Sequence, residues 1–239
     1  MRAELRAAGD QIAARDRLLT VAAHELLSPV SGLLLQTDVL ATLLETPVEN
    51  ALQIEQALEM MQDQGQLLAD LIRKLLDVGS LGAGHLRLSL DPTDLSAIVR
   101  DVLNRAEPSI QHSRCRLTLE LQPAPGRWDR LRLTQVVTNL LSNALKYGRG
   151  EPILVRVTSE AEVAHLIVED RGGGIPVGDR ARVLRAYERI PQAIGTPGLG
   201  LGLYISAQIV AAHGGAMRIE GDPDTGARVI VDLPCNPAR

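Results

Sequence analysis

The chain has 239 residues, of which 45% are hydrophobic and 23% are charged. That apolar content suits one large or two modest globular domains and excludes a disordered chain. A formal net charge of −4 and a pI near 5.8 argue against a nucleic-acid surface, which needs clustered excess Lys and Arg, so we expect no nucleic-acid partner. The two cysteines, Cys115 and Cys235, form no CxxC pair, which favours two buried thiols in a reducing cytosol over a structural zinc site.

Apolar runs in this chain, such as residues 33–35, fall far short of the about 20 residues that a membrane helix needs. The N-terminal segment carries too many charges for a signal peptide. We therefore expect a cytoplasmic chain with no membrane span. Because the chain contains no Phe, its cores must be filled by Leu, Val, Ile and Ala.

Residues 1 to about 82 carry the heptad patterns of two helices. In the first pattern Leu or Ile recurs every seven residues, which predicts one long coiled-coil-like helix. Residues 46–50 interrupt it, with Thr46 predicted as the N-cap of a second helix and Pro47 as its first position. The second pattern fades at the glycines of residues 79–84. The heptad positions are Leu5, Ile12, Leu19, Leu26, Leu33 and Leu40 in the first helix and Ile54, Met61, Leu68 and Leu75 in the second, joined by Leu58 and Ile72.

These two helices predict an antiparallel hairpin whose apolar stripes a single copy cannot cover. The usual solution is a second copy, which gives a two-fold symmetric four-helix bundle. We therefore predict a homodimer.

A histidine, a carboxylate, a hydroxyl and a proline lie within six positions of the first helix, at His24, Glu25, Ser28 and Pro29. His24 precedes Leu26 by two residues, about 200° around the helix from the seam at about 100° per residue, so it is predicted to point outward. Pro29 donates no amide hydrogen and crowds the carbonyl of Glu25, which disturbs the helix beside the histidine. The alternative is an exposed histidine beside a kink with no function, and this segment alone does not decide between the two.

Residues 86 to 239 alternate between strand and helix patterns. This mixture predicts an α/β sandwich with helices on one sheet face, and therefore an α+β chain as a whole. The predicted strands are residues 86–90, 115–121, 153–160, 162–170, 216–221 and 227–234, and the predicted helices are residues 93–107, with its N-cap at Thr93 or Asp94, 129–147 and 203–213.

The helix over residues 129–147 places Asn139, Asn143 and Lys146 on one face, opposite a buried apolar stripe. Two amide oxygens one turn apart can hold a hydrated Mg²⁺, and a lysine one turn further can meet phosphate charge. A solvated polar face is the alternative for this helix by itself.

Two glycine-rich turns follow this helix in the sequence. Asp170 ends a predicted strand just before Gly172 and Gly174, where a carboxylate can accept a hydrogen bond from an amino group on a flat ring that approaches the main chain. Residues 195–205 place glycines before an apolar helix, which leaves free amides that can cradle an anion. Each turn alone is a weak signal, and their order and co-occurrence carry the weight.

Four segments, HELLSP, NLLSNALKYG, DRGGGIP and GLGLGLYI, resemble in this order and spacing the H, N, G1 and G2 boxes of sensor histidine kinases. The resemblance starts near residue 15 and covers nearly all of the remaining chain. It implies a dimerisation and phosphotransfer hairpin over residues 15–84 and an ATP-binding domain of the gyrase, Hsp90 and MutL type over residues 86–236. Residues 1–20 look like a signalling helix that continues from an upstream sensor domain or sensor protein, with Met1 either the native start or the edge of a truncation.

By position in these boxes, the resemblance implies that His24 accepts the γ-phosphoryl group of ATP and that Glu25 accepts or orients the imidazole proton. Near neutral pH an imidazole has a free lone pair, and a neighbouring carboxylate stabilises the charge that develops. The metal ligands would be Asn143 and Asn139. With Ser28 as the further H-box residue, the implied ATP site consists of Asn139, Asn143, Lys146, Tyr147, Asp170, Gly172, Gly174, Gly198, Leu199, Gly200, Leu201 and Gly202.

The chain departs from the family pattern at several positions. Leu27 stands where the family usually has a basic residue, and Ser28 where Thr or Asn is common and helps to orient water for dephosphorylation, so phosphatase activity is left open. In the lid region Leu199 replaces the usual Thr of the G2 box, and residues 183–189 offer Tyr187 as their aromatic side chain in place of phenylalanine.

Asn139 stands where related ATPases resemble a glutamate that activates water. An amide cannot act as that base at neutral pH, so phosphate is expected to go to a protein group. The predicted function is an ATP- and Mg²⁺-dependent histidine kinase that phosphorylates itself on His24 and then an aspartate of a response-regulator receiver domain. Two alternatives are a nucleotide-binding scaffold whose degenerate lid prevents transfer and an ATP-hydrolysing member of the same fold.

Overall fold

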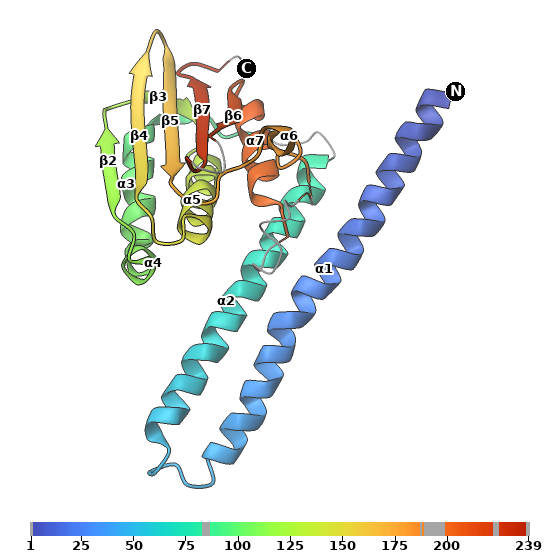
Figure 1. The fold of residues 1–239 in the computed structure, drawn as a ribbon, viewed down its shortest axis with the longest axis vertical. Helices are drawn as coiled ribbons and strands as arrows, with labels where there is room; N and C mark the ends of the chain where they lie inside the picture. Colours follow the sequence, from blue (N-terminus) through green and yellow to red (C-terminus); the bar gives the residue numbers. More distant parts are fainter. Residues whose placement is uncertain (1, 83–86, 187, 189–198, 222–224, 238–239) are drawn as a thin grey trace. The chain divides into compact units, whose positions relative to one another are not determined.

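The computed structural model describes residues 2–82, 87–186, 188, 199–221 and 225–237. The chain divides into two compact units, the first made mainly of residues 1–79 and the second of most of the rest. The first unit is a helical hairpin, and the second is a sheet with helices packed on it (Figure 1). The predicted α+β class is therefore confirmed.

Two long helices, α1 (Arg2–Leu43) and α2 (Ala51–Gly82), run antiparallel in the first unit (Figure 1). The predicted N-cap at Thr46 is wrong, because α2 begins five residues later. Asn50 holds the start of α2 instead: its carbonyl accepts the amide of Ile54 at 2.9 Å, and its side-chain amide donates to the Leu43 carbonyl at 3.1 Å. Asn50 thus links the end of α1 to the start of α2.

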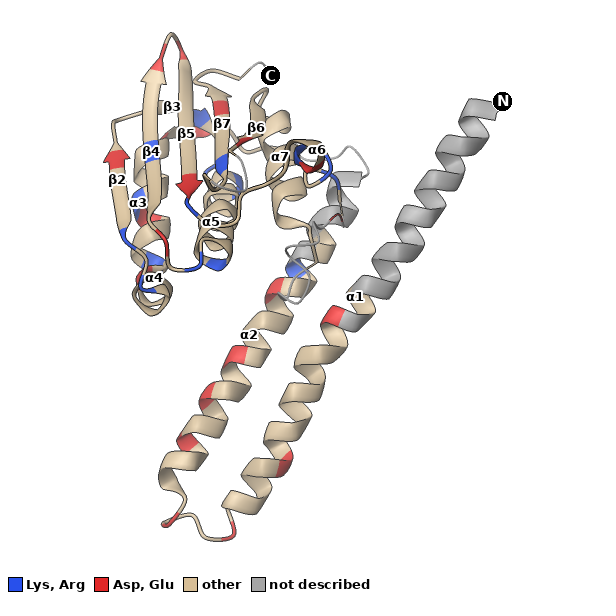
Figure 2. Cartoon of the chain, viewed as in Figure 1, with Lys and Arg blue, Asp and Glu red and all other residues tan. Residues whose placement is uncertain are grey.

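The predicted heptad positions fill the hairpin only in part. Ile54, Met61, Leu68 and Leu75 are half-buried, whereas Leu58 and Ile72, which were predicted to join them, are 45% and 44% exposed. The buried positions of α2 are instead Ala57 and Leu71, at 1% and 4% exposed, and Pro29 is buried inside α1, which continues through it. A second set of apolar side chains stays in solvent in the single chain, with Leu34 at 62% and Leu76 at 70% exposed. Acidic residues predominate along the described part of this hairpin (Figure 2). One hairpin thus covers only part of its apolar surface.

The prediction that the chain has no membrane span is not confirmed. One stretch within the described residues, Glu25–Leu43, is long and apolar enough to cross a membrane by length and composition, with a hydropathy of 1.4 and 6% of it buried. The same composition is expected of a heptad helix that buries its second face against another copy.

The second unit is built on a five-stranded sheet in which β2 pairs parallel with β4 and all other pairs are antiparallel. Burial alternates along β4 and β5, as expected for a sheet with one covered face. In spatial order the strands are β2 (Leu117–Leu121), β4 (Ile153–Glu160), β5 (Val163–Asp170), β7 (Arg228–Pro234) and β6 (Ala216–Glu220).

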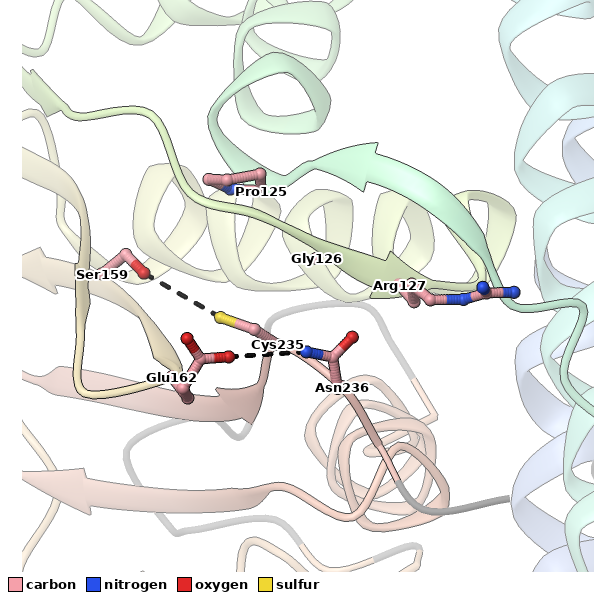
Figure 3. Close-up of a pocket in the computed structure, with 7 residues that line it drawn as sticks. All are labelled: Pro125, Gly126, Arg127, Ser159, Glu162, Cys235 and Asn236. Atoms are coloured by element: carbon pink, nitrogen blue, oxygen red, sulfur yellow. Dashed lines mark hydrogen bonds between the residues drawn. The ribbon is translucent and has the colours of Figure 1, made fainter.

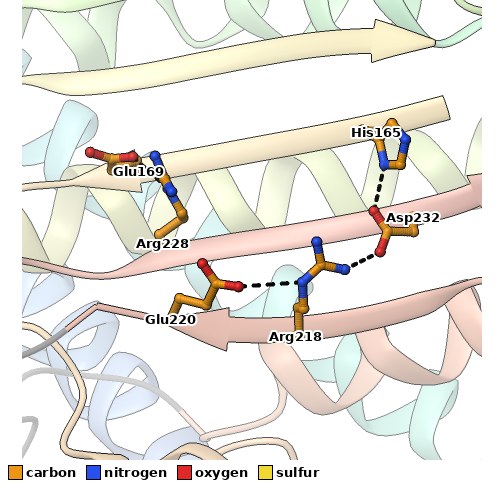
Figure 4. Close-up of polar contacts among 6 residues, drawn as sticks. All are labelled: His165, Glu169, Arg218, Glu220, Arg228 and Asp232. Carbon is orange, nitrogen blue, oxygen red and sulfur yellow. Dashed lines mark hydrogen bonds and ion pairs between the residues drawn. The ribbon is translucent and has the colours of Figure 1, made fainter. Parts of the chain in front are cut away.

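Three helices, α3 (Leu95–Arg105), α5 (Arg130–Tyr147) and α7 (Gly202–Ala212), cover one face of this sheet (Figure 1). The predicted α/β sandwich is therefore confirmed. The opposite face carries ion pairs (Figure 4): Arg228 contacts Glu169 at 2.7 Å, and Asp232 contacts both His165, at 2.6 Å, and Arg218. Charge pairs suit the face that no helix covers.

The strand predicted at residues 86–90 is wrong, because the described residues 87–90 form no strand. The amide of Ser89 donates instead to the Asp129 carboxylate at 3.0 Å, so a side chain takes the place of a neighbouring strand. The strand lies just after it, where β1 (Asp91–Asp94) pairs with β3 (Pro125–Trp128), which was not predicted. The short helices α4 (Glu107–Ser113) and α6 (Val177–Arg180) were also not predicted, since four to seven residues carry little periodicity.

Trp128 anchors the entry to α5 in the core. Its ring is 0% exposed, and its indole N–H donates to the carbonyl of Pro234 at 2.8 Å. The helix predicted from Asp129 begins one residue later, at Arg130, and Asp129 is its N-cap, because its carboxylate accepts the amide of Arg132 at 3.0 Å. These two contacts fix where α5 starts and therefore where its polar residues lie.

His213 completes this anchor from the end of α7. It is 0% exposed; its Nε2 accepts the Asp129 amide at 3.0 Å and its Nδ1 lies 2.8 Å from the Ile209 carbonyl. Burial lowers the pKa of His213, so the ring is neutral with its proton on Nδ1. The histidine is therefore a structural residue that joins α7 to α5.

Candidate functional site: a nucleotide site and a phosphoacceptor helix

The predicted phosphoacceptor segment lies within the continuous helix α1. His24 occupies a helical position there, although its side chain lies outside the part that the structure describes. Of its neighbours, Glu25 is half-buried, Ser28 is exposed and Leu27 is 62% exposed. The segment around the histidine thus presents both a hydroxyl and an apolar side chain to solvent.

Helix α5 carries the first part of the predicted ATP site. The predicted apolar stripe is buried, whereas Asn139 and Asn143 are half-buried and Lys146 is exposed. The amide nitrogen of Asn139 donates to the Gly202 carbonyl at 3.3 Å. Asn139 therefore ties the middle of α5 to the first turn of α7, a role that the sequence pattern did not predict. The stripe consists of Leu133, Val136, Val137, Leu140, Leu141 and Ala144.

Asp170 is the last residue of β5 and lies almost fully inside the domain, at 8% exposed. Its Oδ1 accepts the amide of Gly172 at 2.9 Å, and its own amide donates to the carbonyl of Ala227 at 2.9 Å. Burial raises the pKa of the Asp170 carboxyl above its ordinary value. A buried carboxylate at a glycine turn is a strong acceptor for an amino group that replaces the lost water.

Glycine is required at position 172 because the turn lies against the end of α5. A Cβ on Gly172 would lie 2.2 Å from the carbonyl oxygen of Tyr147 and 2.9 Å from the Cα of Gly148. Gly174 has a φ of 59°, in the left-handed region that a side chain disfavours. The structure thus brings the Asp170–Gly174 turn against Tyr147, more than twenty residues earlier in the chain.

Gly148 is a site residue that the sequence analysis missed. A Cβ at this position would lie 2.5 Å from the Ala144 carbonyl and 3.4 Å from the Cβ of Asp170. A glycine directly after the last residue of a predicted helix was the available signal. Beside it, the Lys146 ammonium lies 5.4 Å from the centre of the Tyr147 ring. The end of α5 therefore carries the Lys146 charge over the ring of Tyr147.

The glycine-rich segment leads into α7. Gly200 has a φ of 66°, Leu199 and Leu201 are buried, and Gly202 is the first residue of the helix. The first amides of a helix have no partner within it and favour an anion. Gly198 and Tyr187 lie outside the described residues, so these two predictions remain untested.

Mg²⁺ suits the predicted site in its donor chemistry. Hard cations prefer oxygen ligands, and Mg²⁺ often takes only one or two from a protein and the rest from phosphates and water. Asn143 and Asn139 offer amide oxygens one turn apart on a half-buried helix face. The described residues contain no cluster of three or more His, Cys, Asp or Glu that would make a separate metal centre.

A shallow pocket of about 330 Å³ lies between β3, the β4–β5 turn and Cys235 (Figure 3). Glu162, which lines this pocket, directly precedes β5, whereas Asp170 is the last residue of β5. The pocket therefore lies at the opposite end of the strand from the nucleotide site. Two polar contacts connect residues that line this pocket. Ser159 Oγ lies 3.9 Å from Cys235 Sγ, and the Asn236 side-chain amide donates a hydrogen bond to the Glu162 carboxylate at 3.4 Å.

Comparison with known proteins agrees with both halves of the chain. Residues 14–84 match the His Kinase A (phospho-acceptor) domain, and residues 128–237 match the histidine kinase-, DNA gyrase B- and HSP90-like ATPase. The alginate biosynthesis sensor protein KinB of Pseudomonas aeruginosa is 30% identical over 223 residues, which cover 92% of this chain and 37% of that protein. The signal transduction histidine-protein kinase/phosphatase MprB of Mycobacterium tuberculosis is 31% identical over an alignment of 241 positions, gaps included, that covers 96% of this chain and 46% of that protein.

The fold comparison reaches the same group of proteins. The structure of the Acinetobacter baumannii histidine kinase AdeS superposes with a TM-score of 0.65 at 22% identity, over 89% of this chain and 98% of that one. The chain spans less than half the length of the KinB and MprB relatives that it matches. With a phospho-acceptor domain followed by an ATPase domain of this kind, the chain belongs to the sensor histidine kinase family and comprises its catalytic core.

Proposed function

We propose that the chain is an ATP- and Mg²⁺-dependent protein histidine kinase that phosphorylates itself on His24 and passes the phosphoryl group to an aspartate of a response-regulator receiver domain. The observation that carries the proposal is the convergence of the end of α5, the Asp170 turn and the start of α7, in a chain that also bears a phosphoacceptor-type hairpin. These two features support a nucleotide site and a phosphate acceptor in one chain.

In the proposed reaction an imidazole nitrogen of His24 attacks the γ-phosphorus of ATP. A nitrogen–phosphorus bond forms, the bond to the β-phosphate oxygen breaks, and ADP leaves. Glu25 accepts or holds the remaining imidazole proton, because a carboxylate stabilises the charge that develops on the ring. Transfer to the receiver aspartate then returns the histidine to its neutral form.

The ATP-binding domain contributes mainly position and charge, as phosphoryl transfer requires. Asp170 accepts a hydrogen bond from the adenine amino group, while Gly172 and Gly174, which have no side chains, let the adenine ring approach the main chain. Lys146 and the first amides of α7 offset phosphate charge, and the amide oxygens of Asn143 and Asn139 would hold Mg²⁺, which would supply further charge neutralisation.

The exposed apolar side chains of the hairpin support a homodimer as the working form, since a second copy would remove them from water. We further place this kinase core in the cytoplasm, where receiver domains and ATP are available, and expect its input from an upstream sensor domain or sensor protein. No described residue favours the alternative, a scaffold that binds nucleotide without transfer.

One labelling experiment tests the proposal. After incubation with γ-labelled ATP and Mg²⁺, the protein should carry a label that is labile in acid and stable in alkali, and His24→Gln should carry none. His112→Gln, at an exposed histidine of the ATP-binding domain, is the matched control and should label normally. Full labelling of His24→Gln would exclude the site; nucleotide binding without label would favour the scaffold, and rapid release of free phosphate an ATPase.

A further inference from the structure

Arg180 is the last residue of the short helix α6, which follows the Asp170 turn and lies next to β6 (Figure 1). Its Nε donates to the carbonyl of Ile175 at 3.3 Å, and its Nη2 donates to the carbonyl of Gly221. Ile175 directly follows Gly174 in the nucleotide turn, whereas Gly221 directly follows β6, 41 residues further along the chain from Arg180. One guanidinium therefore joins two segments that are distant in sequence.

The segment that Arg180 reaches is itself in close contact with Asp170. A Cβ on Gly226 would lie 1.9 Å from the Asp170 carbonyl oxygen, and a Cβ on Gly221 would lie 2.1 Å from the Gly226 carbonyl oxygen. The carbonyl of Ala227 also accepts the Asp170 amide at 2.9 Å. The two ends of the β6–β7 connection thus form a backbone wall against the main chain of Asp170.

These contacts close a ring. The main chain runs from Asp170 through the glycine turn to Ile175. The Arg180 side chain bonds Ile175 to Gly221, Gly221 lies against Gly226, and Gly226 lies against Asp170. The far side of the turn is held by Gly172 against the end of α5. Other hydrogen bonds of the same segment, such as Asp179 amide to Pro176 carbonyl at 2.9 Å, are turns within α6 itself. Through these two bonds Arg180 connects the end of the turn to the wall against Asp170.

Arginine suits this place because its planar guanidinium offers several donors in fixed directions and can serve two carbonyls at once. A lysine has one flexible ammonium and reaches one of them with less directional control. The ordinary explanation, a surface arginine with incidental contacts, does not account for a half-buried side chain that bonds two main-chain oxygens on separate segments.

We propose that Arg180 is a positioning residue for adenine recognition: it holds the glycine turn against the β6–β7 connection, so that the Asp170 carboxylate and the Gly172 main chain keep the spacing that a purine amino edge requires. This inference rests on the proposed nucleotide site. It adds a residue that touches no nucleotide and acts through the turn.

The test compares nucleotide affinity and base selectivity in the full chain. Titration calorimetry with Mg²⁺ gives dissociation constants for ADP and for GDP, neither of which can donate a γ-phosphoryl group. Arg180→Ala should weaken ADP binding about tenfold and reduce the preference for ADP over GDP, whereas Arg180→Lys should recover part of both. Arg116→Ala, at an exposed arginine on β2's side of the domain, is the control and should match wild type.

The preference for ADP over GDP distinguishes a positioning role from a loss of stability. Partial unfolding of a variant lowers the fraction of protein able to bind either nucleotide and therefore weakens both affinities equally. If Arg180→Ala does not fold by circular dichroism, Arg180→Lys decides: an ADP preference like that of wild type overturns the inference, and a reduced preference supports it. A wild-type chain that binds no ADP would refute the proposed nucleotide site itself, whereas normal wild-type binding with an unchanged variant refutes only the role of Arg180.

Discussion

The carboxylate of Asp170 accepts a hydrogen bond from the amide of Gly172 at 2.9 Å while remaining only 8% exposed. The carboxylate at the end of β5 is thus largely shielded from water. The hydrogen bond from the Gly172 amide replaces part of the hydration that it has lost. Such a position favours a bound group that can donate a hydrogen bond, and it penalises the empty site.

Asp170→Asn should stabilise the empty domain at neutral pH and weaken nucleotide binding. Because burial raises the pKa of Asp170 in the folded state, the folded form favours the protonated carboxyl, so the charged carboxylate reduces stability above that raised pKa. The difference in unfolding midpoint between variant and wild type should therefore be largest near pH 7 and shrink as the pH falls toward about 4. Fluorescence of Trp128, the single tryptophan, reports the unfolding. A lower midpoint for the variant at pH 7 would contradict the burial argument.

Gly172→Ala should disrupt the nucleotide turn, because the new Cβ would lie 2.2 Å from the Tyr147 carbonyl oxygen. Relief requires the turn to move away from α5, at about 1–3 kcal/mol of stability, with loss of ADP binding. Gly173→Ala is a matched control one residue away, since a Cβ there meets no atom within 4 Å. Calorimetric titration of both variants checks the prediction, and equal ADP affinities for the two would show that the close approach has no role.

His213→Ala should destabilise the ATP-binding domain by about 2–4 kcal/mol, because it leaves the Asp129 amide without its acceptor and opens a cavity in the core. Burial lowers the pKa of His213, so its contribution is fully present above the unfolded-state value of about 6.5 and is lost as the pH falls through the folded-state pKa. Urea unfolding should show a smaller gap between variant and wild type at pH 5 than at pH 8. His112→Ala, at an exposed site, should leave the midpoint unchanged, and a gap that widens in acid would reverse the assignment of the neutral ring.

Trp128→Phe should lower the free energy of unfolding by about 1–3 kcal/mol. The phenyl ring fills less of a fully buried site and leaves the Pro234 carbonyl without the indole donor. Circular dichroism during urea unfolding measures the effect, since the variant loses the fluorescent side chain. Leu131→Ala, at a side chain that is 75% exposed on α5, should change stability by less than about 0.5 kcal/mol. Equal losses in the two variants would argue against the anchor.

Leu34→Gln combined with Leu58→Gln should convert the proposed homodimer to monomers at micromolar concentration. The two side chains are 62% and 45% exposed in the single hairpin, and burying a leucine in the dimer would contribute about 1.5–3 kcal/mol each. Size-exclusion chromatography with light scattering gives the mass of each form. Glu59→Gln, an exposed polar change on α2, should stay dimeric. A wild-type chain that is already monomeric would refute the bundle.

Much of the architecture could be predicted from local patterns. The heptads predicted α1 and α2 because a coiled-coil seam repeats every seven residues, and the alternation along residues 153–160 and 163–170 predicted β4 and β5 because one sheet face is covered. The stripe on α5 was likewise readable, and it fixed the side on which Asn143 lies. These features depend on neighbours within one or two turns, which the sequence contains in full.

Other features depend on segments far apart along the chain, and only the tertiary structure decided them. The tie from Asn139 to Gly202, the wall of Gly226 against Asp170 and the bond from His213 to Asp129 each join residues that no local periodicity relates. The misplaced strand before β1 has the same origin, since the partner of Ser89 is a side chain 40 residues away. The sequence by itself determined which helices and strands form and which polar residues they carry; packing between distant segments decided their order in the sheet and the geometry of the site, because burial and hydrogen bonding act through space.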